Sequence, residues 1–168
     1  MTTYSSAVNV NGGATVVIQP GIYTQLITAN NGTLTFTHGI YDLQAGININ
    51  GATVNDDGAG GEMLYITGGQ FKITSGTVNL HAPTSGTYKG MLLFQAPADT
   101  NAVIMTDGNM TVTGAIYAKT AQLQITDGHF TNSTIVVDNI RISNGTGGAQ
   151  FNGPAATQLT GPSVAFIQ

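Results

Sequence analysis

Residues 66–75 read ITGGQFKITS, and the chain repeats this pattern as IMTDGNMTVT at 104–113 and as ITDGHFTNST at 125–134. In each copy, apolar residues that alternate with polar ones stand on both sides of a glycine-containing turn. A short unit that recurs along a chain is the signature of a solenoid, in which every repeat forms one coil. The repeat therefore predicts a stack of coils.

Glycine positions set the expected length of a coil. Alignment on the turn matches Gly69, Gly108 and Gly128, so that the last two are separated by one unit and the first two by nearly two. The GIY tripeptides at 21–23 and 39–41 are separated by almost the same length of chain as one unit. We therefore expect an all-β fold, a single-stranded right-handed parallel β-helix (β-solenoid) with coils of about 18–20 residues.

Composition also favours strands. Only 7% of the residues are charged, against about 25% in ordinary soluble domains, so Thr, Asn, Ser, Gln and Gly must cover the surface. These residues are unfavourable inside helices. The apolar fraction of 41% fills one core over residues 1–168. Residues 1–13 are expected to be an N-terminal cap or first coil, and 146–168 an irregular tail or cap; a β-sandwich or jelly roll is the alternative fold.

Residues 90–97, GMLLFQAP, form the most continuous apolar run in the chain. A strand that is buried on both faces has this appearance, whereas a half-exposed strand alternates apolar and polar residues. The run predicts such a doubly buried strand.

The charge balance limits the partners. The net charge is −4, and the four cations are Lys72, Lys89, Lys119 and Arg141. They cannot form the basic stripe that nucleic acids require, so nucleic acid is not an expected partner. Cysteine is absent, which excludes a disulfide framework. No run of about 18 apolar residues and no secretion signal is present, so no membrane-spanning segment is expected.

Four segments carry a family resemblance: QPGIY at 19–23, FTHGIYDL at 36–43, LHAPTSGTYKGMLLFQ at 80–95 and TGAIYA at 113–118. Their order and spacing resemble the Gly-rich β-helical extracellular domain at the C-terminal end of Tad-like and type IV pilus-assembly proteins of bacteria. The resemblance covers roughly residues 14–145 and implies a surface location and a right-handed parallel β-helix. It implies no catalytic residue. The sequence departs from the family at His38, where Pro is usual, and it lacks the family's membrane-anchoring N-terminal helix.

Parallel β-helices also host polysaccharide lyases and hydrolases, which need paired carboxylates or a base beside a cation. The candidates are a loop with three acids, a histidine in the sequence GHF and an arginine in RIS: Asn55, Asp56, Asp57, Glu62, His129 and Arg141. Acids followed by Gly-His and Arg-Ile resemble the order found in polygalacturonases. The spacings differ from that family, however, and Phe130 replaces its second glycine. We therefore assign no catalytic residue and expect Asp56-Asp57-Gly58 to form a solvated turn.

The same loop, from Asn55 to Glu62, is the candidate calcium site because Ca²⁺ takes six to eight oxygen ligands. It lacks alternating aspartates, and the chain has no GGxGxDxU repeat. The pairs Asp107-Gly108 and Asp127-Gly128 are expected to be corner residues. Three histidines, His38, His81 and His129, fall in different expected coils without the spacing of zinc ligands. No metal or cofactor is therefore predicted, and the ligand of the loop stays open.

Tyr23, Tyr41 and Tyr117 each follow Gly-Ile or Ala-Ile, and we expect them at equivalent positions of successive coils. There they would either form an outward aromatic platform for glycans or pack half-buried in the stack. Threonine-rich segments such as TLTFT suggest ice binding as another function, which needs a flat, regular array of threonines. Since the threonine spacing drifts along the sequence, ordinary polar outward faces are favoured. Asn-x-Ser/Thr sequons occur at Asn31, Asn109, Asn132 and Asn144.

These observations lead to a functional hypothesis. The chain is expected to be a non-catalytic, extracellular structural or adhesive module of a bacterial surface appendage or self-assembling filament. Its partners would be further copies or other surface proteins that bind the exposed coil edges, and possible glycans. A virion protein, such as a capsid decoration or tail-spike module, and a polysaccharide-active β-helix enzyme are the alternatives.

Overall fold

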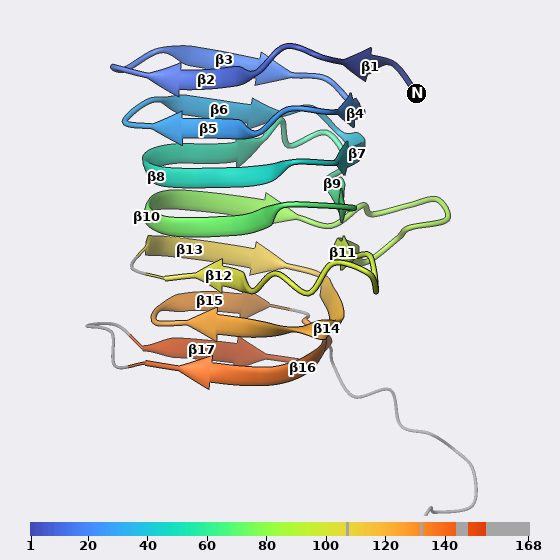
Figure 1. Ribbon diagram of the computed structural model, residues 1–168. Helices are drawn as coiled ribbons and strands as arrows, with labels where there is room; N and C mark the ends of the chain where they lie inside the picture. Colours follow the sequence, from blue (N-terminus) through green and yellow to red (C-terminus); the bar gives the residue numbers. More distant parts are fainter. Residues whose placement is uncertain (107, 132, 144–147, 154–168) are drawn as a thin grey trace, which may run out of the picture.

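The computed structural model describes residues 1–106, 108–131, 133–143 and 148–153. This part of the chain is all-β, without a helix, and its strands pair in parallel from β1 to β17. Coils of strands stack from the N-terminus downward in a right-handed sense (Figure 1). The expected right-handed parallel β-solenoid is confirmed, and the β-sandwich and jelly roll, which need antiparallel hairpins, are not what the chain forms.

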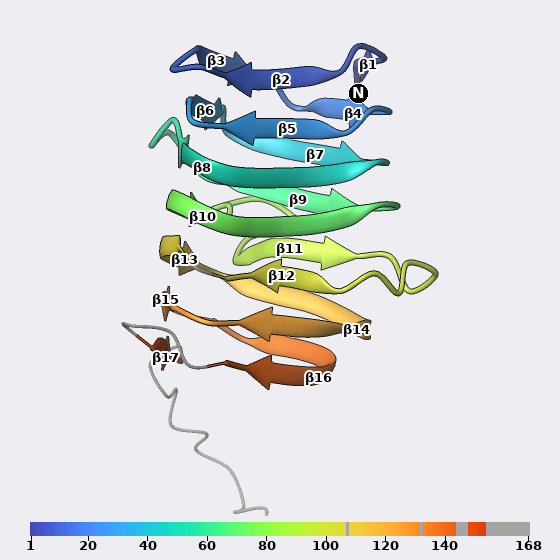
Figure 2. The same ribbon diagram turned by 60° about the vertical axis from the view of Figure 1, so that its left-hand side comes forward.

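Three faces run along the stack. The first face comprises β1 (Thr3–Tyr4), β4 (Gly21–Tyr23), β7 (Gly39–Leu43), β9 (Glu62–Ile66), β11 (Met91–Gln95) and the first parts of β14 (Ala115–Ile125) and β16 (Ile135–Ile142). The second face comprises β2 (Val8–Asn11), β5 (Ile27–Asn30), the first parts of β8 (Gly46–Asp56) and β10 (Gln70–His81), β12 (Val103–Met105) and the second parts of β14 and β16. The third face comprises β3 (Thr15–Ile18), β6 (Thr33–Phe36), the second parts of β8 and β10, β13 (Gly108–Thr113), β15 (Gly128–Thr131) and β17 (Ala149–Asn152). First-face and second-face strands run in opposite directions across the stack (Figure 2).

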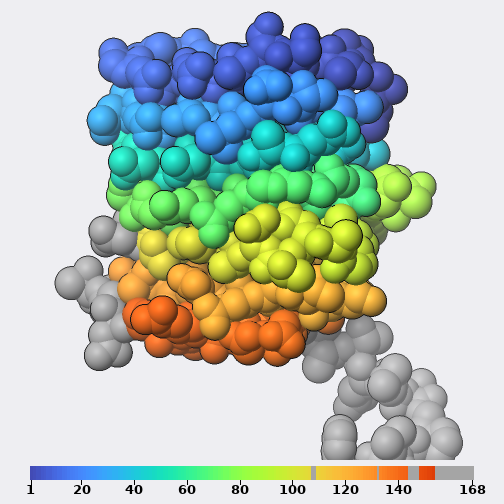
Figure 3. All heavy atoms as spheres, viewed as in Figure 1, coloured from blue at the N-terminus to red at the C-terminus, as the bar shows by residue number. Residues whose placement is uncertain are grey.

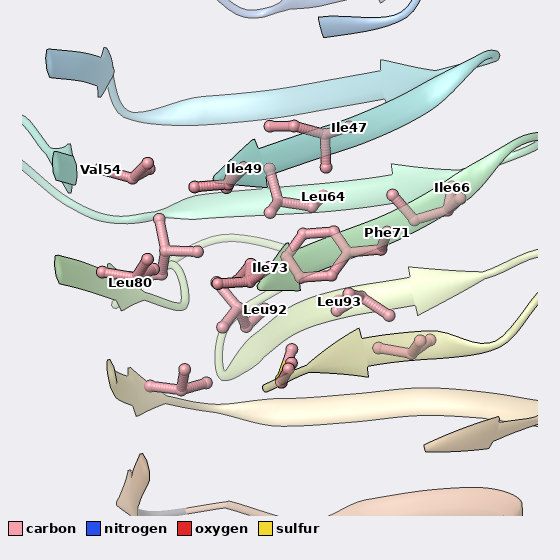
Figure 4. Close-up of a cluster of buried hydrophobic side chains, with 14 of the residues drawn as sticks. Ile47, Ile49, Val54, Leu64, Ile66, Phe71, Ile73, Leu80, Leu92 and Leu93 are labelled. Carbon is pink, nitrogen blue, oxygen red and sulfur yellow. The ribbon is translucent and has the colours of Figure 1, made fainter. Parts of the chain in front are cut away.

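The core consists of aliphatic columns between the three faces. One column runs through Ile27, Ile47 and Phe71 and continues with Val103 and Leu123, all of them at most 2% exposed. Side chains from all three faces meet in the middle of the stack (Figure 4). Burying one such side chain stabilises the fold by about 1.5–3 kcal/mol, so a coil depends on an adjacent coil for its stability.

Strand register corrects the proposed alignment of the repeat. Gly108 pairs with Gly76, not with Gly69, and Met105 pairs with Ile73. The copies at 104–113 and 125–134 both pass from the second face to the third. The copy at 66–75 passes from the first face to the second, which is the preceding corner of its coil. The reason is that each coil turns three corners, and a strand–turn–strand pattern occurs at more than one of them.

Coil length varies more than the sequence predicts. In the first coils Thr15 pairs with Thr33 and Thr33 with Thr53, as the expected repeat length requires. Further down the stack Thr77 pairs with Asn109, so the length of chain between paired residues nearly doubles. Inserted loops at corners account for the increase, and the loop 82–90 projects from the side of the stack (Figures 1 and 3).

Two further expectations need correction. In β11, Leu92 and Leu93 are buried, but Phe94 points outward and is only half-buried, so this strand is not buried on both faces. A register shift between Met91 and Leu93 explains how two consecutive leucines both reach the core. Strand β17 lies within the range expected to be irregular; residues 146–147 and 154–168 of that range are outside the described part of the chain.

Substitution of Gly76 tests the stacked register. Gly76 has a positive φ of 117°, and a methyl group there would overlap the carbonyl oxygen of Ala52 in the coil above. Gly86 has φ of 79° in the projecting loop with open space around it. We expect Gly76→Ala to lower the free energy of unfolding by roughly 3 kcal/mol and Gly86→Ala by about 1 kcal/mol. Equal losses in denaturant titrations would show that Gly76 does not lie against the neighbouring coil.

Candidate functional site

Two loops meet at the corner between the third and first faces. Residues 57–61 join β8 to β9, and residues 82–90 join β10 to β11. The amide of Thr84 donates to the carbonyl of Gly60 over 3.0 Å. Within the longer loop, Gly90 N–H donates to Pro83 O at 2.8 Å and Met91 N–H to Tyr88 O at 3.0 Å. These bonds hold the projecting loop in one shape against the stack.

Asp56, the last residue of β8, and Asp57, the first residue of the shorter loop, each contact a histidine. Asp56 Oδ2 lies 2.8 Å from His81 Nδ1, and Asp57 Oδ2 lies 3.2 Å from His38 Nδ1. Asp57 also accepts bonds from the amides of Ala59 and His38, and these bonds, that from Ala59 most of all, lower its pKa. Sequence spacing gave no sign of these pairs, because the partners belong to different coils and come together only where the coils stack.

Glu62 is fully buried beside this cluster. Its Oε1 accepts the amide of His81 at 3.1 Å, while Oε2 has no hydrogen-bond partner within the described residues. Burial, followed by the nearby charges of Asp56 and Asp57, raises the pKa of Glu62 to about 8. At neutral pH the carboxyl group is therefore mostly protonated, which is the form that tolerates a site without a compensating cation.

The candidate catalytic residues are not brought together. His129 lies on the third face, paired with Thr111, and Arg141 lies on the second face, paired with Gln124. Neither belongs to the corner that holds the acids. Glu62 itself is enclosed, so its carboxyl group has no open route to a substrate, although general acid catalysis requires direct contact with the leaving group.

Metal binding gains no support from the corner. Among residues 1–106, 108–131, 133–143 and 148–153, no three His, Asp or Glu side chains are grouped to hold a metal ion. The carboxylates of the Asn55 to Glu62 loop bond instead to histidines and to backbone amides. Asp107 of the expected corner pair lies outside the described residues, and the carboxylate of Asp127 accepts the amide of Gly148.

A groove beside the projecting loop is the second feature of the site. It encloses about 490 Å³ between Tyr88 and Lys89 on the loop and Met63, Tyr65 and Phe94 on the first face. A smaller pocket of about 330 Å³ lies on the other side of the loop, against His38 and Ile40. The loop thus forms a fixed wall between two shallow depressions.

Outward aromatic rings continue from this groove down the first face. Tyr65 and Phe94 pack edge to face with centroids 5.6 Å apart, and Phe94 stacks on Tyr117 at 4.9 Å with planes 9° apart. Parallel rings this close cover part of each other's faces, so this row joins three successive coils through ring contacts. Phe94 and Tyr65 were missed in the sequence; the alternation within MLLFQ is the signal that could have found Phe94.

The three tyrosines expected at equivalent positions occupy three different columns. Tyr23 pairs with Leu43, Tyr41 with Gly21 and Tyr117 with Phe94. Tyr23 and Tyr41 are buried. Desolvation raises the pKa of both phenols, that of Tyr23 to about 12. The prediction of equivalence was wrong because the tripeptide at 39–41 begins earlier in its coil than the tripeptide at 21–23, so that the first residue of one meets the last residue of the other.

The sequons lie at different kinds of positions. Asn31 is at a corner with a positive φ of 53°. Asn109 is exposed on the third face, paired with Thr77. Asn132 and Asn144 lie outside the described residues.

Comparisons with protein-family models, with curated proteins and with solved structures found no match for this chain. Within the described residues there is no helix of the length and apolar character needed to cross a membrane.

The buried carboxyl group of Glu62 predicts a pH dependence of stability. Because its folded pKa of about 8 is higher than its ordinary value of 4.5, the folded state holds a proton that the unfolded state releases between these values. The contribution of Glu62 to the free energy of unfolding should therefore be complete below about pH 4.5 and fall by a few kcal/mol as the pH rises to about 8. Urea titrations from about pH 5 to 8 measure this slope.

The variant Glu62→Gln should remove most of the slope, since glutamine does not titrate. Asp138→Asn is the matched control, because it removes an exposed carboxylate on β16 that is not among the charges acting on Glu62. A slope that survives in Glu62→Gln would assign the pH dependence to other groups.

Proposed function

We propose that this chain is a non-catalytic structural or adhesive module of a bacterial surface appendage or self-assembling extracellular filament, in which copies join end to end. The observation that carries the proposal is the open C-terminal end of the described stack. The resemblance of the segment 80–95 to pilus-associated β-helical domains supports the same assignment, as does the low charge.

The ends of the described stack present unpaired backbone groups. In this part of the chain, β1, β2 and β3 pair only with the coil below, and β16 and β17 only with the coil above. An exposed strand edge is a template for another strand. The pairings within the stack are parallel, so a first coil placed beneath a last coil would continue the solenoid. Such a head-to-tail contact repeats without closing and produces a filament.

The core columns also open at the last described coil. Ile140, Ile142 and Phe151 are 48%, 60% and 42% exposed, whereas their column neighbours Leu123, Ile125 and Phe130 in the coil above are fully buried. Apolar side chains that point along the stack favour association, because a further coil would remove them from water.

The first coil is more closed on its inward side. Val10 and Ile18 are 0% and 5% exposed, although Val8 and Val16 are only partly buried. Both ends carry strand edges, and head-to-tail contact keeps the strands parallel as they are within the stack, which favours it over tail-to-tail contact.

Ile142→Lys in the full chain tests the end interface. Ile142 is the most exposed of the three apolar residues at this end, and a charge there should weaken self-association by about tenfold or more, since a buried unpaired charge is costly. Val136→Lys is the matched control because Val136 is 42% exposed in the same coil but faces sideways. Sedimentation velocity over a concentration series and electron microscopy give the readout; isolated wild-type monomers at every concentration would contradict the proposal.

Absence of turnover is the second expectation. Purified protein incubated with a panel of neutral and acidic polysaccharides should release no reducing ends and no unsaturated products, because the carboxylates of Asp56 and Asp57 are bonded to histidines and backbone amides and that of Glu62 is enclosed. Turnover that is abolished by Asp56→Asn or Asp57→Asn would overturn the non-catalytic assignment.

A further inference from the structure

The third face carries a regular array of hydroxyl and amide side chains. Its first column consists of Thr15, Thr33, Thr53, Thr77 and Asn109, which pair in register on successive coils. Its second column consists of Thr35, Asn55, Asn79 and Thr111, two positions further along β6, β8, β10 and β13; on β3 the corresponding position is the exposed Val17, which is not a member. We call the members of these two columns the threonine–asparagine array.

The array cannot be recognised from the spacing of its members in the sequence. The length of chain between successive members of the first column grows from coil to coil, and this drift argues against a regular surface when the sequence is considered alone. The structure corrects that inference, because the additional residues lie in corners and loops such as 57–61 and 82–90, outside the strands. In space each member lies about 4.8 Å from the next, and the two columns are roughly 6.6 Å apart.

The array is rigid. Threonine is branched at Cβ and has a restricted χ1 angle, so its hydroxyl and methyl groups keep fixed positions on a strand. In the second column, Asn79 Nδ2 donates to Asn55 Oδ1 at 3.2 Å, which orients both amides. The strands beneath are anchored by fully buried Leu34, Val54 and Val78. A surface of this kind loses little conformational entropy when it orders a layer at its face.

No member of the array is charged. The nearest ionisable side chains stand at its borders: His81, Asp56 and Asp57 at the corner, and His129 below Thr111. Charged groups impose tightly oriented hydration shells, whereas hydroxyl and amide groups exchange hydrogen bonds with water in either direction. Every array position therefore accepts a water molecule as donor or acceptor.

From this geometry we propose that the threonine–asparagine array is an ice-binding surface. Ice presents water oxygens in a two-dimensional repeat of comparable spacing, and the array offers hydrogen-bonding groups in fixed columns with threonine methyl groups between them. Waters held by the array join the lattice as its outer layer. This activity does not depend on whether copies assemble end to end, so it stands apart from the proposed appendage role.

Thr53→Lys, at the centre of the first column, tests the proposal. The lysine side chain stands above the plane of the array and keeps a flat solid away from it. Thr28→Lys is the matched control, since Thr28 is a half-buried outward threonine on the second face, paired with Asn48. Circular dichroism and thermal unfolding are the check that both variants fold.

Thermal hysteresis and ice shaping are measured on a nanolitre osmometer with the full chain. Wild type and Thr28→Lys should both shape ice crystals and depress their growth temperature. The thermal hysteresis of Thr53→Lys should be about tenfold lower than that of wild type. A wild-type protein that leaves ice growth unchanged overturns the proposal. Equal activity in Thr53→Lys moves the activity to another face and likewise overturns it.

Binding to powdered cellulose or chitin is measured in parallel, because crystalline polysaccharides also present regular hydroxyl groups. Retention on these solids without any effect on ice would assign the array to a polysaccharide and reject ice. Failure of ice binding with intact self-association would reject this inference alone, and the reverse result would reject the end-to-end proposal alone.

Discussion

Parallel hydrogen bonding between successive coils is the constraint on which the whole structure depends. One coil of this chain cannot enclose its own apolar residues, since its strands form a single layer around a narrow centre. Stacking supplies both the backbone partners and the neighbours that fill each column, as in the series Ile27, Ile47 and Phe71. The same stacking sets the positions of outward residues at about 4.8 Å intervals. The aromatic row and the threonine–asparagine array are both consequences of this spacing.

Much of the fold was predictable because the periodicity of a strand depends only on residues that are adjacent in the sequence. The alternation of Phe71, Ile73, Val78 and Leu80 with polar neighbours identifies the inward side of a strand without any knowledge of the next coil. Low charge and frequent glycine exclude a helical alternative. These are local properties, and local properties are what a single sequence shows most clearly.

The pairing register between successive coils was not predictable, because it depends on the number of residues in each corner and loop. Thr53 and Thr77 pair directly although a loop lies between them, whereas Gly21 and Gly39 stand in matching tripeptides, closer together in the sequence, and do not pair. The acid–histidine pairs at the corner follow the same rule, since Asp56 meets His81 only after the intervening loop has been accommodated. The sequence likewise does not distinguish Glu62 from the other acids of a solvated loop. Its burial results from the stacking of the coils around it.

Engineered disulfides test the register most directly, because the chain contains no cysteine. Thr35 and Asn55 pair across adjacent coils, so their Cα atoms are about 4.8 Å apart and within the range of roughly 4.4–6.8 Å that a disulfide spans. Thr33 and Asn55 are diagonal to each other at about 8 Å. The double variant Thr35→Cys/Asn55→Cys should oxidise to an intramolecular disulfide detected by mass spectrometry, while Thr33→Cys/Asn55→Cys should keep free thiols. Oxidation of the diagonal pair in preference to the direct pair would contradict the stacking register.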